Sequence, residues 1–139
     1  MYYADEAIMC TNPELSSCRD SDKMVGFIAS KSHRAITDQD PVRQRLLVTR
    51  YDPVRAAKEE SLALDDIQEL LGLPLLGVIP ESSSVLTSTN LGQPVIMGTD
   101  KASIAYKDMV ARFLGEDIPM KYVEPQHTGF LSRIFGNSE

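Results

Sequence analysis

The chain has 139 residues, of which 42% are hydrophobic and 24% are charged, and its formal net charge is −6. This length and composition suit one ordinary globular domain with enough apolar residues for a core. The acidic balance argues against a general nucleic-acid binder, which would present a basic surface. Cys10 and Cys18 lack metal-ligand or C-x-x-C spacing and are too few for a disulfide framework, so we interpret them as reduced, packed thiols. No apolar run approaches the ~18 residues of a membrane-spanning helix, and MYYADE at residues 1–6 shows no secretory signal pattern.

A strand and a helix are the first elements expected in chain order. The short apolar run 7–11 predicts a buried strand that ends before Asn12 and Pro13. Asn12 is a favourable helix N-cap, and Pro13 suits the first helical position, where its missing N–H costs nothing. We therefore expect a helix from there to about Lys31. Its apolar positions at helical spacing are Leu15, Cys18, Val25, Ile28 and Ala29.

The middle of the chain predicts a loop, a strand and a helix. Residues 32–44 are polar and charged, which is typical of a surface loop. Residues 45–53, RLLVTRYDP, predict a second buried strand that a proline ends. A helix is expected over 62–72, with Ser61 as its cap and Gly72 at its end. The apolar stripe of that helix is Leu64, Ile67, Leu70 and Leu71.

The last third predicts one more strand and one more helix. Residues 74–80 form an apolar run between two prolines and predict a third buried strand. Residues 81–98 are rich in Ser, Thr, Gly and Pro and are expected to be mostly loop. A helix is expected over 99–114, ended by Gly115, and residues 121–124 could add a short strand. The stripe of the last helix is Ile104, Ala105, Met109, Val110, Phe113 and Leu114.

Strand, helix, strand, helix, strand, helix is the pattern of an α/β fold, a parallel sheet with flanking helices. The three strands are continuous apolar runs, which favours burial on both faces of the sheet. In such sheets ligands bind where the carboxyl ends of the strands meet the following loops. Those loops are residues 11–14, 49–53 and 80–84. A ligand site at this edge would involve Asn12, Arg50 and Asp52.

Four stretches of the chain resemble the MinD family, membrane-associated ATPases that place the division site in bacteria and plastids. The stretches are residues 4–31, 46–53, 75–96 and 129–136. The resemblance runs in register over nearly the whole chain, except 32–44 and 55–60. TNPE, SSxRDSD and GVIPE are weak signals alone, but their order and spacing before an amphipathic tail are specific. The resemblance implies the C-terminal part of a P-loop NTPase domain with a Rossmann-like fold, followed by an amphipathic tail helix.

The resemblance also identifies what these 139 residues lack. The family's chemistry depends on a Gly-rich loop and its lysines, which hold the phosphates, and none of the eight glycines belongs to a G-x-x-x-x-G-K-S/T motif. The family's magnesium-binding and water-positioning carboxylates lie before the position that matches Met1. ATP and Mg²⁺ are the cofactors implied for the full-length family, but we expect these residues alone to hold neither tightly and not to hydrolyse ATP. The chain is then a gene fragment, a partial sequence or a genuine half-protein.

The resemblance implies that the loops after the strands surround the adenine of the nucleotide. Asn12 and Arg50 match base-proximal positions, and Pro13, Asp52 and Pro53 match the walls of that pocket. An Asn side chain offers a donor and an acceptor to a base edge, and an Arg plane stacks on it. From the residues alone, Asn12 can equally be a helix cap and Arg50 half of a surface ion pair. Asp52 stands where many relatives carry Asn, which leaves its role open.

A partner surface is implied for residues 16–23, SSCRDSDK. In the family this helix binds both the division inhibitor MinC and the topological factor MinE. Arg19, Asp20 and Asp22 fall on the matching positions and are expected to bind partners. The structural alternative is that acidic residues near a helix N-terminus only complement the helix dipole.

The C-terminal tail, residues 129–139, is expected to bind membranes, after a linker at 125–128 and the ATPase half-domain at 1–124. Its apolar residues are Phe130, Leu131, Ile134 and Phe135. A helix would place all four on one face, with Arg133 among anionic lipid headgroups. The alternative is that this face packs back on the body of the protein. A single short tail binds weakly, whereas two linked tails can bind ~10²–10⁴ times better.

These expectations describe part of a nucleotide-gated peripheral ATPase that positions the division septum. In the family, ATP-dependent homodimerisation presents two tails at once. The protein would be cytoplasmic and peripheral on the inner face of the cell membrane, or in the plastid stroma at the inner envelope. Two alternatives remain: a non-catalytic truncated module that binds membrane or partners, and another ParA-class ATPase.

Overall fold

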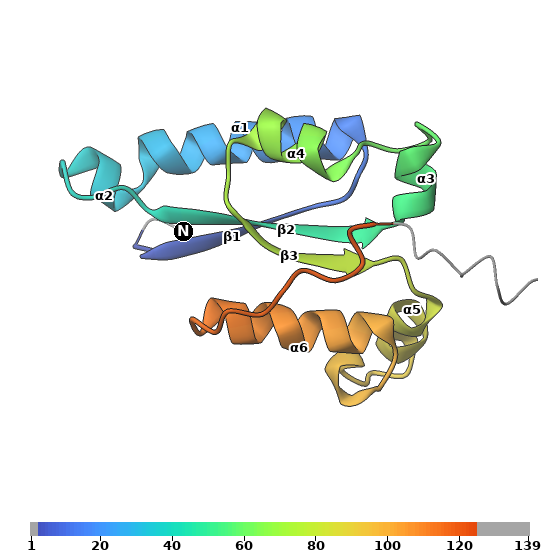
Figure 1. The fold of residues 1–139 in the computed structure, drawn as a ribbon. Coiled ribbons are helices and arrows are strands. Elements are labelled where there is room, and N and C mark those ends of the chain that lie inside the picture. Colours follow the sequence, from blue (N-terminus) through green and yellow to red (C-terminus); the bar gives the residue numbers. More distant parts are fainter. Residues whose placement is uncertain (1–2, 125–139) are drawn as a thin grey trace, which may run out of the picture.

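Three parallel strands form the centre of the fold, as Figure 1 shows. The structure is a computed structural model and describes residues 3–124. The strands are β1 (Glu6–Thr11), β2 (Arg43–Tyr51) and β3 (Leu75–Pro80). They lie in the order β1-β2-β3, and both neighbouring pairs are parallel. The predicted α/β fold with a parallel sheet is confirmed.

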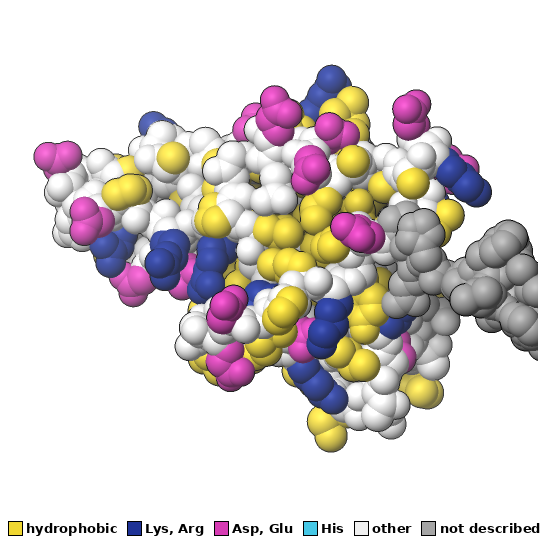
Figure 2. All heavy atoms as spheres, viewed as in Figure 1, with side chains coloured by type: hydrophobic (Ala, Val, Ile, Leu, Met, Phe, Trp, Pro, Cys, Tyr) yellow, Lys and Arg dark blue, Asp and Glu magenta, His cyan; other side chains and the backbone are white. Residues whose placement is uncertain are grey.

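Helices cover both faces of this sheet (Figure 1). On one face lie α1 (Leu15–Lys31) and α4 (Leu64–Leu71), and on the other lies α6 (Lys101–Phe113). The shorter elements are α2 (His33–Ile36), α3 (Pro53–Ala57), α5 (Ser83–Asn90) and the 3₁₀ turn η1 (Val95–Met97). In the space-filling view of Figure 2, hydrophobic side chains show between the two helical layers. Within residues 3–124, no helix combines the length and the apolar character needed to cross a bilayer.

The hydrophobic core is divided by the sheet into layers. Beneath α1 and α4 the buried residues are Cys18, Leu46, Val48, Tyr51, Ile67, Leu71 and Val78. On the α6 side they are Leu47, Ile79, Ala102 and Ala105. Gly77 allows α6 to lie close to β3, because a Cβ at this position would be 3.1 Å from Cβ of Met109. The apolar runs of the sequence therefore do form the buried strands.

One of the three strands is not buried on both faces. The prediction holds for β2 and β3 but is wrong for β1, where Ile8 is 39% exposed and Cys10 is also exposed. The reason is that α6 packs chiefly under β3, so that among the described residues this face of β1 is only partly covered. Cys18 is buried as expected, whereas the expectation of a packed thiol is wrong for Cys10.

The start of α1 differs from the expectation. The N-cap residue is Glu14, and the helix begins at Leu15 rather than at Pro13. Asn12 is not the cap; its Oδ1 accepts a hydrogen bond from the backbone N–H of Glu14 at 3.2 Å. A residue before proline is restricted to extended conformations, so Asn12 closes a turn instead of entering the helix. On the helix itself Leu15 and Ala29 are exposed, against prediction, while Cys18 and Ile28 are buried.

Two stretches expected to be loops contain short helices. Residues 32–44 include α2, whose N-cap Ser32 accepts from the backbone N–H of Ala35, and they also include the start of β2. Residues 81–98 include α5, which begins after the cap Ser82, and the turn η1. Their polar, Ser- and Thr-rich sequences have weak helix propensity, so the capping contacts and tertiary packing set these helices.

The observed helices α4 and α6 differ in detail from the two predicted helices. Ala63, not Ser61, precedes α4, and Gly72 ends it in the left-handed conformation at φ 61°, as expected. On α6 the small residues Ala102, Ser103 and Ala105 face the core, whereas Ile104, Val110, Phe113 and Leu114 of the predicted stripe are partly or largely exposed. Residues 121–124 do not form the short strand that was considered: residues 122–124 are a bend, and Lys121 precedes it without regular structure.

Candidate functional site

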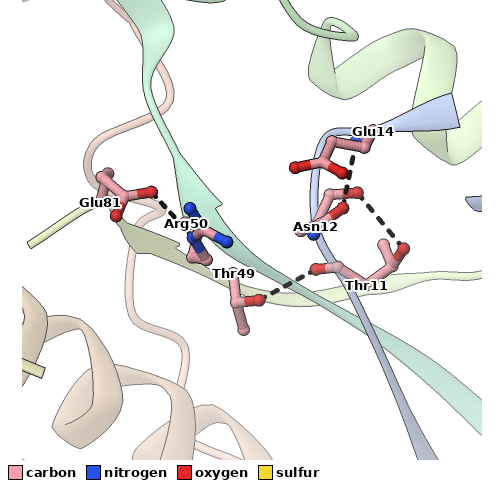
Figure 3. A network of polar contacts seen from close by, with 6 residues as sticks. All are labelled: Thr11, Asn12, Glu14, Thr49, Arg50 and Glu81. Atoms are coloured by element: carbon pink, nitrogen blue, oxygen red, sulfur yellow. Dashed lines mark hydrogen bonds and ion pairs between the residues drawn. The ribbon is translucent and has the colours of Figure 1, made fainter. Parts of the chain in front are cut away.

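The carboxyl ends of the three strands bring the loops 11–14, 49–53 and 80–84 to one edge of the sheet, as expected for a parallel sheet. Figure 3 shows the contacts between these loops. The hydroxyl of Thr49 donates to the backbone carbonyl of Thr11 at 3.2 Å, which joins the first loop to the second.

Arg50 joins the second loop to the third. Its Nε donates to Oε2 of Glu81 at 3.1 Å, and both side chains are about half exposed or more. The surface ion pair considered for Arg50 is therefore present, and pairs of this kind add little to stability. Arg50 also has φ 56°, an uncommon conformation for a residue with a side chain. Strained residues of this kind persist where the surroundings hold them, often at binding sites.

Asp52 caps a helix that the sequence did not predict. Its Oδ1 accepts from the backbone N–H groups of Val54 at 2.9 Å and Arg55 at 3.4 Å, and Pro53 occupies the first turn of α3. The carboxylate is thereby held at the carboxyl edge of the sheet.

The residues predicted for the site line different cavities. One of about 420 Å³ is lined by Arg50, Glu81, Leu86 and Tyr106, among others. A second, of about 570 Å³, is lined by Tyr51, Asp52, Pro53, Val54, Pro80, Glu81, Lys101, Ile104, Tyr122 and Glu124. Pro13 lines a third, of about 680 Å³, beside α3 and α4. Asn12 lines none of these three cavities, so the five predicted residues share an edge of the sheet but not a single cavity.

The second cavity, which we call the carboxyl-edge cavity, has walls of mixed chemistry. Tyr51, Pro53 and Ile104 contribute apolar surface, and Asp52, Glu81 and Glu124 contribute carboxylates, with Lys101 the cation among the lining residues. Burial, together with the negative charges of Asp65, Asp52 and Asp66, raises the pKa of Tyr51 above its ordinary value. Such walls suit a flat, uncharged group that carries N–H or O–H donors, and they disfavour phosphates.

A carboxylate network ties the start of α5 to the start of α6. Oδ2 of Asp100 accepts from the hydroxyls of Ser82, at 2.9 Å, and Ser84, while its Oδ1 accepts from the backbone N–H of Ser103 at 3.0 Å and from the Ser103 hydroxyl. The donors of Ser103, Ser84 and Ser82 hold the pKa of Asp100 well below its usual range. Ser82 lines the first cavity, and Lys101, which follows Asp100 in the chain, lines the second. The network therefore holds part of the wall of each cavity in place.

The predicted partner residues lie on the surface of α1. Arg19, Asp20 and Asp22 are all exposed, and Asp20 pairs with Lys23 at 2.9 Å. The first turn of α1 contains no acidic residue, and the dipole effect falls off beyond that turn. Complementing the helix dipole therefore does not explain Asp20 and Asp22.

Exposed apolar side chains lie on the same face of α1 as Asp20. Met24 is 43% exposed and Phe27 is 46% exposed, and with Asp20 they follow the i, i+4, i+7 spacing of one helix face. The residues predicted for the membrane tail, Phe130, Leu131, Arg133, Ile134 and Phe135, lie outside the described residues. Within residues 3–124, no group of three or more His, Cys, Asp or Glu side chains is arranged to hold a metal ion.

Sequence reasoning identified the edge but missed several of its residues. Lys101, Tyr122 and Glu124 line the carboxyl-edge cavity although they lie far along the chain from the loops that first defined it. Of the residues that line this cavity beyond the first two loops, Pro80 and Glu81 are the two that a sequence motif indicated, since they end GVIPE.

Comparison with known proteins identifies close relatives over almost the whole chain. No family model matches the sequence. The septum site-determining protein MinD of Escherichia coli K12 is 48% identical over 137 residues, which is 98% of this chain and 51% of that protein. MinD of Neisseria meningitidis serogroup B is 51% identical over 137 residues, 98% of this chain and 50% of that protein. The chain thus spans about half the length of the curated relatives it matches.

Solved structures show the same fold. The MinD cell division protein of Aquifex aeolicus has a TM-score of 0.76 and 32% identity, covering 85% of this chain and 47% of that one. The MinC:MinD complex of the same organism gives a TM-score of 0.72 at 32% identity, over 85% of this chain and 46% of that one. MinD of Pyrococcus horikoshii OT3, solved with Mg-ADP, has a TM-score of 0.59 and 26% identity, covering 80% of this chain and 43% of that one. In sequence and in fold, the chain matches the C-terminal half of the MinD family of septum site-determining proteins.

Proposed function

We propose that this chain supplies the C-terminal half of a MinD-like ATPase that determines the site of the division septum. The observation that carries the proposal is the 48% identity to a septum site-determining protein over 98% of the chain. The α/β fold of residues 3–124 agrees with it, with a TM-score of 0.76 to a MinD structure. The half-domain is assigned to residues 1–124, the linker to 125–128 and the tail to 129–139.

In this proposal the chain holds the nucleoside end of ATP, and the other half of the protein holds the phosphates and Mg²⁺. A related MinD from Pyrococcus horikoshii was solved with Mg-ADP, which supports this ligand class. Asp52 and Pro53 are assigned to the nucleoside as residues that line the carboxyl-edge cavity. Asn12, Arg50 and Pro13 lie at the same edge of the sheet outside that cavity, and their assignment to the nucleoside rests on the resemblance alone. The acid-lined carboxyl-edge cavity agrees with this division, because carboxylates repel phosphates but accept hydrogen bonds from ribose and base.

Nucleotide binding should require both halves. We expect a chimera that joins the N-terminal half of Escherichia coli MinD to these 139 residues to bind Mg-ADP in calorimetric titration. The 139 residues alone should show no ATP hydrolysis above background, because they contain no phosphate-binding glycine loop. ATP turnover by the purified 139 residues, retained after repeated purification, would contradict this assignment of roles.

We assign partner binding to α1, through Arg19, Asp20 and Asp22. The solved MinC:MinD complex of Aquifex aeolicus supports a MinC-like partner, and the overlapping role for a MinE-like partner rests on the resemblance of residues 16–23. Asp20, which is exposed in line with Met24 and Phe27, suits a protein interface with an apolar centre and a charged rim, and Arg19 and Asp22 are exposed on the flanks of the same helix.

Charge reversal on this surface should weaken the complex. Asp22→Arg in the chimera is expected to reduce its affinity for Escherichia coli MinC at least about tenfold, since a like charge now faces the partner's complementary group. Glu69→Arg, an equal charge change at an exposed position of α4, should leave the affinity unchanged. Equal effects of the two substitutions would show that net charge, rather than this surface, governs binding.

We further propose that the protein is peripheral on the inner face of the membrane and binds it through the tail. ATP-dependent homodimers would present two tails, whose linked binding compensates for the weakness of one. The four apolar residues and Arg133 of the tail support this reading, and its test is given in the Discussion.

A further inference from the structure

We propose that residues 116–124, here called the strap, contact the bound nucleoside and transmit its presence to the root of the C-terminal tail. The inference rests on the proposed function, because it takes the ligand of the carboxyl-edge cavity to be the nucleoside end of ATP. It adds a connection between that cavity and the tail within a single protomer.

The strap returns the chain from the far end of α6 to the carboxyl edge of the sheet. In Figure 1 it runs as the orange and red coil beside α6 and β3 and ends near the carboxyl ends of β2 and β3. Arg112 anchors its beginning: the guanidinium donates to the carbonyls of Ile118 at 2.7 Å and Pro119 at 2.8 Å. The same side chain donates to the carbonyl of Leu76 in β3 at 3.2 Å, so the strap is fastened to the sheet as well as to α6.

The middle and end of the strap are held by an ion pair and by the core. Nζ of Lys121 lies 2.8 Å from Oδ2 of Asp108, whose side chain is only 13% exposed. Tyr122 packs against the buried cluster on the α6 side, and its neighbour Val123 packs against the cluster beneath α1 and α4. The strap therefore ends in contact with both core layers, immediately before the linker at 125–128.

Tyr122 carries the connection to the cavity. It has φ 63°, a conformation that a bulky side chain rarely adopts and that surrounding contacts must hold in place. Tyr122 and Glu124 line the carboxyl-edge cavity together with Asp52, Pro80 and Lys101. A ligand in this cavity thus touches the strand-end loops and the strap at the same time.

The chemistry of the strap residues suits the nucleoside. The Tyr122 ring offers apolar surface to a flat heterocycle, and the Glu124 carboxylate can accept hydrogen bonds from an amine or a ribose hydroxyl. A ligand shifts a conformational equilibrium only through contacts that differ between the two states. Contacts to Tyr122 and Glu124 exist only when the strap lies in its described position, so the ligand favours that position. Coupling of this kind is reciprocal. If the nucleoside stabilises the described position of the strap by some factor, then holding the strap in that position tightens nucleoside binding by the same factor.

The test uses amide hydrogen exchange in the full chimera with the N-terminal half of Escherichia coli MinD. Mg-ADP should slow exchange in residues 116–124 at least about threefold, along with the loops 49–53 and 80–84. Inorganic triphosphate with Mg²⁺, which lacks the nucleoside, should leave exchange in the strap unchanged. Tyr122→Gly removes the ring but tolerates the positive φ; it should weaken Mg-ADP binding about tenfold and leave triphosphate binding unchanged. Tyr3→Gly, at a 79% exposed tyrosine outside the carboxyl-edge cavity, is the matched control and should bind Mg-ADP like the parent chimera.

The two ways of failing are distinct. If Mg-ADP protects the loops 49–53 and 80–84 but not the strap, and Tyr122→Gly binds Mg-ADP like the parent, the strap inference is overturned and the proposed function stands. If a folded chimera binds neither Mg-ADP nor triphosphate, the proposed function is overturned and the strap inference with it.

Discussion

Replacing Asp100 with alanine should lower the free energy of unfolding by about 2–4 kcal/mol, the sum of a lost helix N-cap and lost hydrogen bonds to a charged group. The carboxylate caps α6 through the backbone N–H of Ser103 and accepts from three serine hydroxyls. Ser103 is fully buried, and in the variant its hydroxyl keeps only the backbone carbonyl of Val95, at 2.7 Å, as a partner. Urea unfolding of the chain at pH 7 measures the loss.

Two further variants distinguish the contribution of the hydrogen-bond network around Asp100 from that of its negative charge. Asp100→Asn keeps oxygen and cap geometry but removes the charge, so its loss should be intermediate. Asp117→Ala, at an exposed position after α6, should stay within about 0.5 kcal/mol of the parent. A loss as large as that of Asp100→Ala in this control would show that the network is not responsible.

The pH dependence of this contribution follows from the pKa of Asp100. Hydrogen bonds from Ser103, Ser84 and Ser82 lower it in the folded protein, so folding favours the ionised carboxylate. The stabilisation is present above the unfolded-state pKa of about 3.9 and is lost as the pH falls towards the lower folded-state pKa. The difference in stability between the parent and Asp100→Asn should therefore be constant above about pH 5 and shrink below about pH 4.

Phe135→Glu should abolish membrane recruitment of the tail. We expect residues 126–139, placed in tandem on a soluble dimeric carrier, to sediment with anionic liposomes, and the same tail on a monomeric carrier to bind poorly. Glutamate at 135 puts a charge within the apolar face of a helix, whose burial drives interfacial binding. Binding of the dimeric carrier should fall at least about tenfold, because both tails lose the burial of a phenylalanine side chain, which contributes ~1.5–3 kcal/mol when complete.

Controls distinguish the apolar face from the net charge of the tail. Ser132→Glu adds the same charge off the predicted stripe and should retain most of the binding. Arg133→Glu should weaken binding mainly on anionic lipid and at low salt, because that contact is electrostatic and screened. If Phe135→Glu binds like the parent, the stripe is not the anchor, and packing of the tail on the body of the protein becomes the better interpretation.

The sequence predicts the sheet well because its three strands are continuous apolar runs bounded by prolines and loops. β2 and β3 fit that pattern because helices cover both of their faces, whereas β1 breaks it because α6 packs chiefly on β3, and Ile8 and Cys10 are exposed. The short helices α2, α3 and α5 escaped prediction because side-chain caps at Ser32, Asp52 and Ser82 begin them. A capping residue before a polar stretch is equally compatible with a loop, so only tertiary packing decides between them.

The location of the candidate site was also predictable, but its walls were not. Parallel strands place their carboxyl ends at one edge, which suffices to bring Asn12, Arg50 and Asp52 to that edge. How the edge divides into cavities depends on side-chain packing and on the path of the strap, which no local pattern encodes. Tyr122 and Glu124 reach the carboxyl-edge cavity along a strap that Arg112 and Asp108 hold to α6.

The position of the division septum tests most directly whether this chain is the C-terminal half of a MinD-like protein. The chimera with the N-terminal half of Escherichia coli MinD would be expressed in Escherichia coli cells that lack their own MinD, with the 139 residues alone as control. The fraction of septa at mid-cell is measured by microscopy, and the level and solubility of each protein by immunoblot. We predict that the chimera restores septa to mid-cell and that the 139 residues alone do not. A soluble chimera that binds Mg-ADP yet leaves septa as misplaced as in cells without MinD would contradict the account.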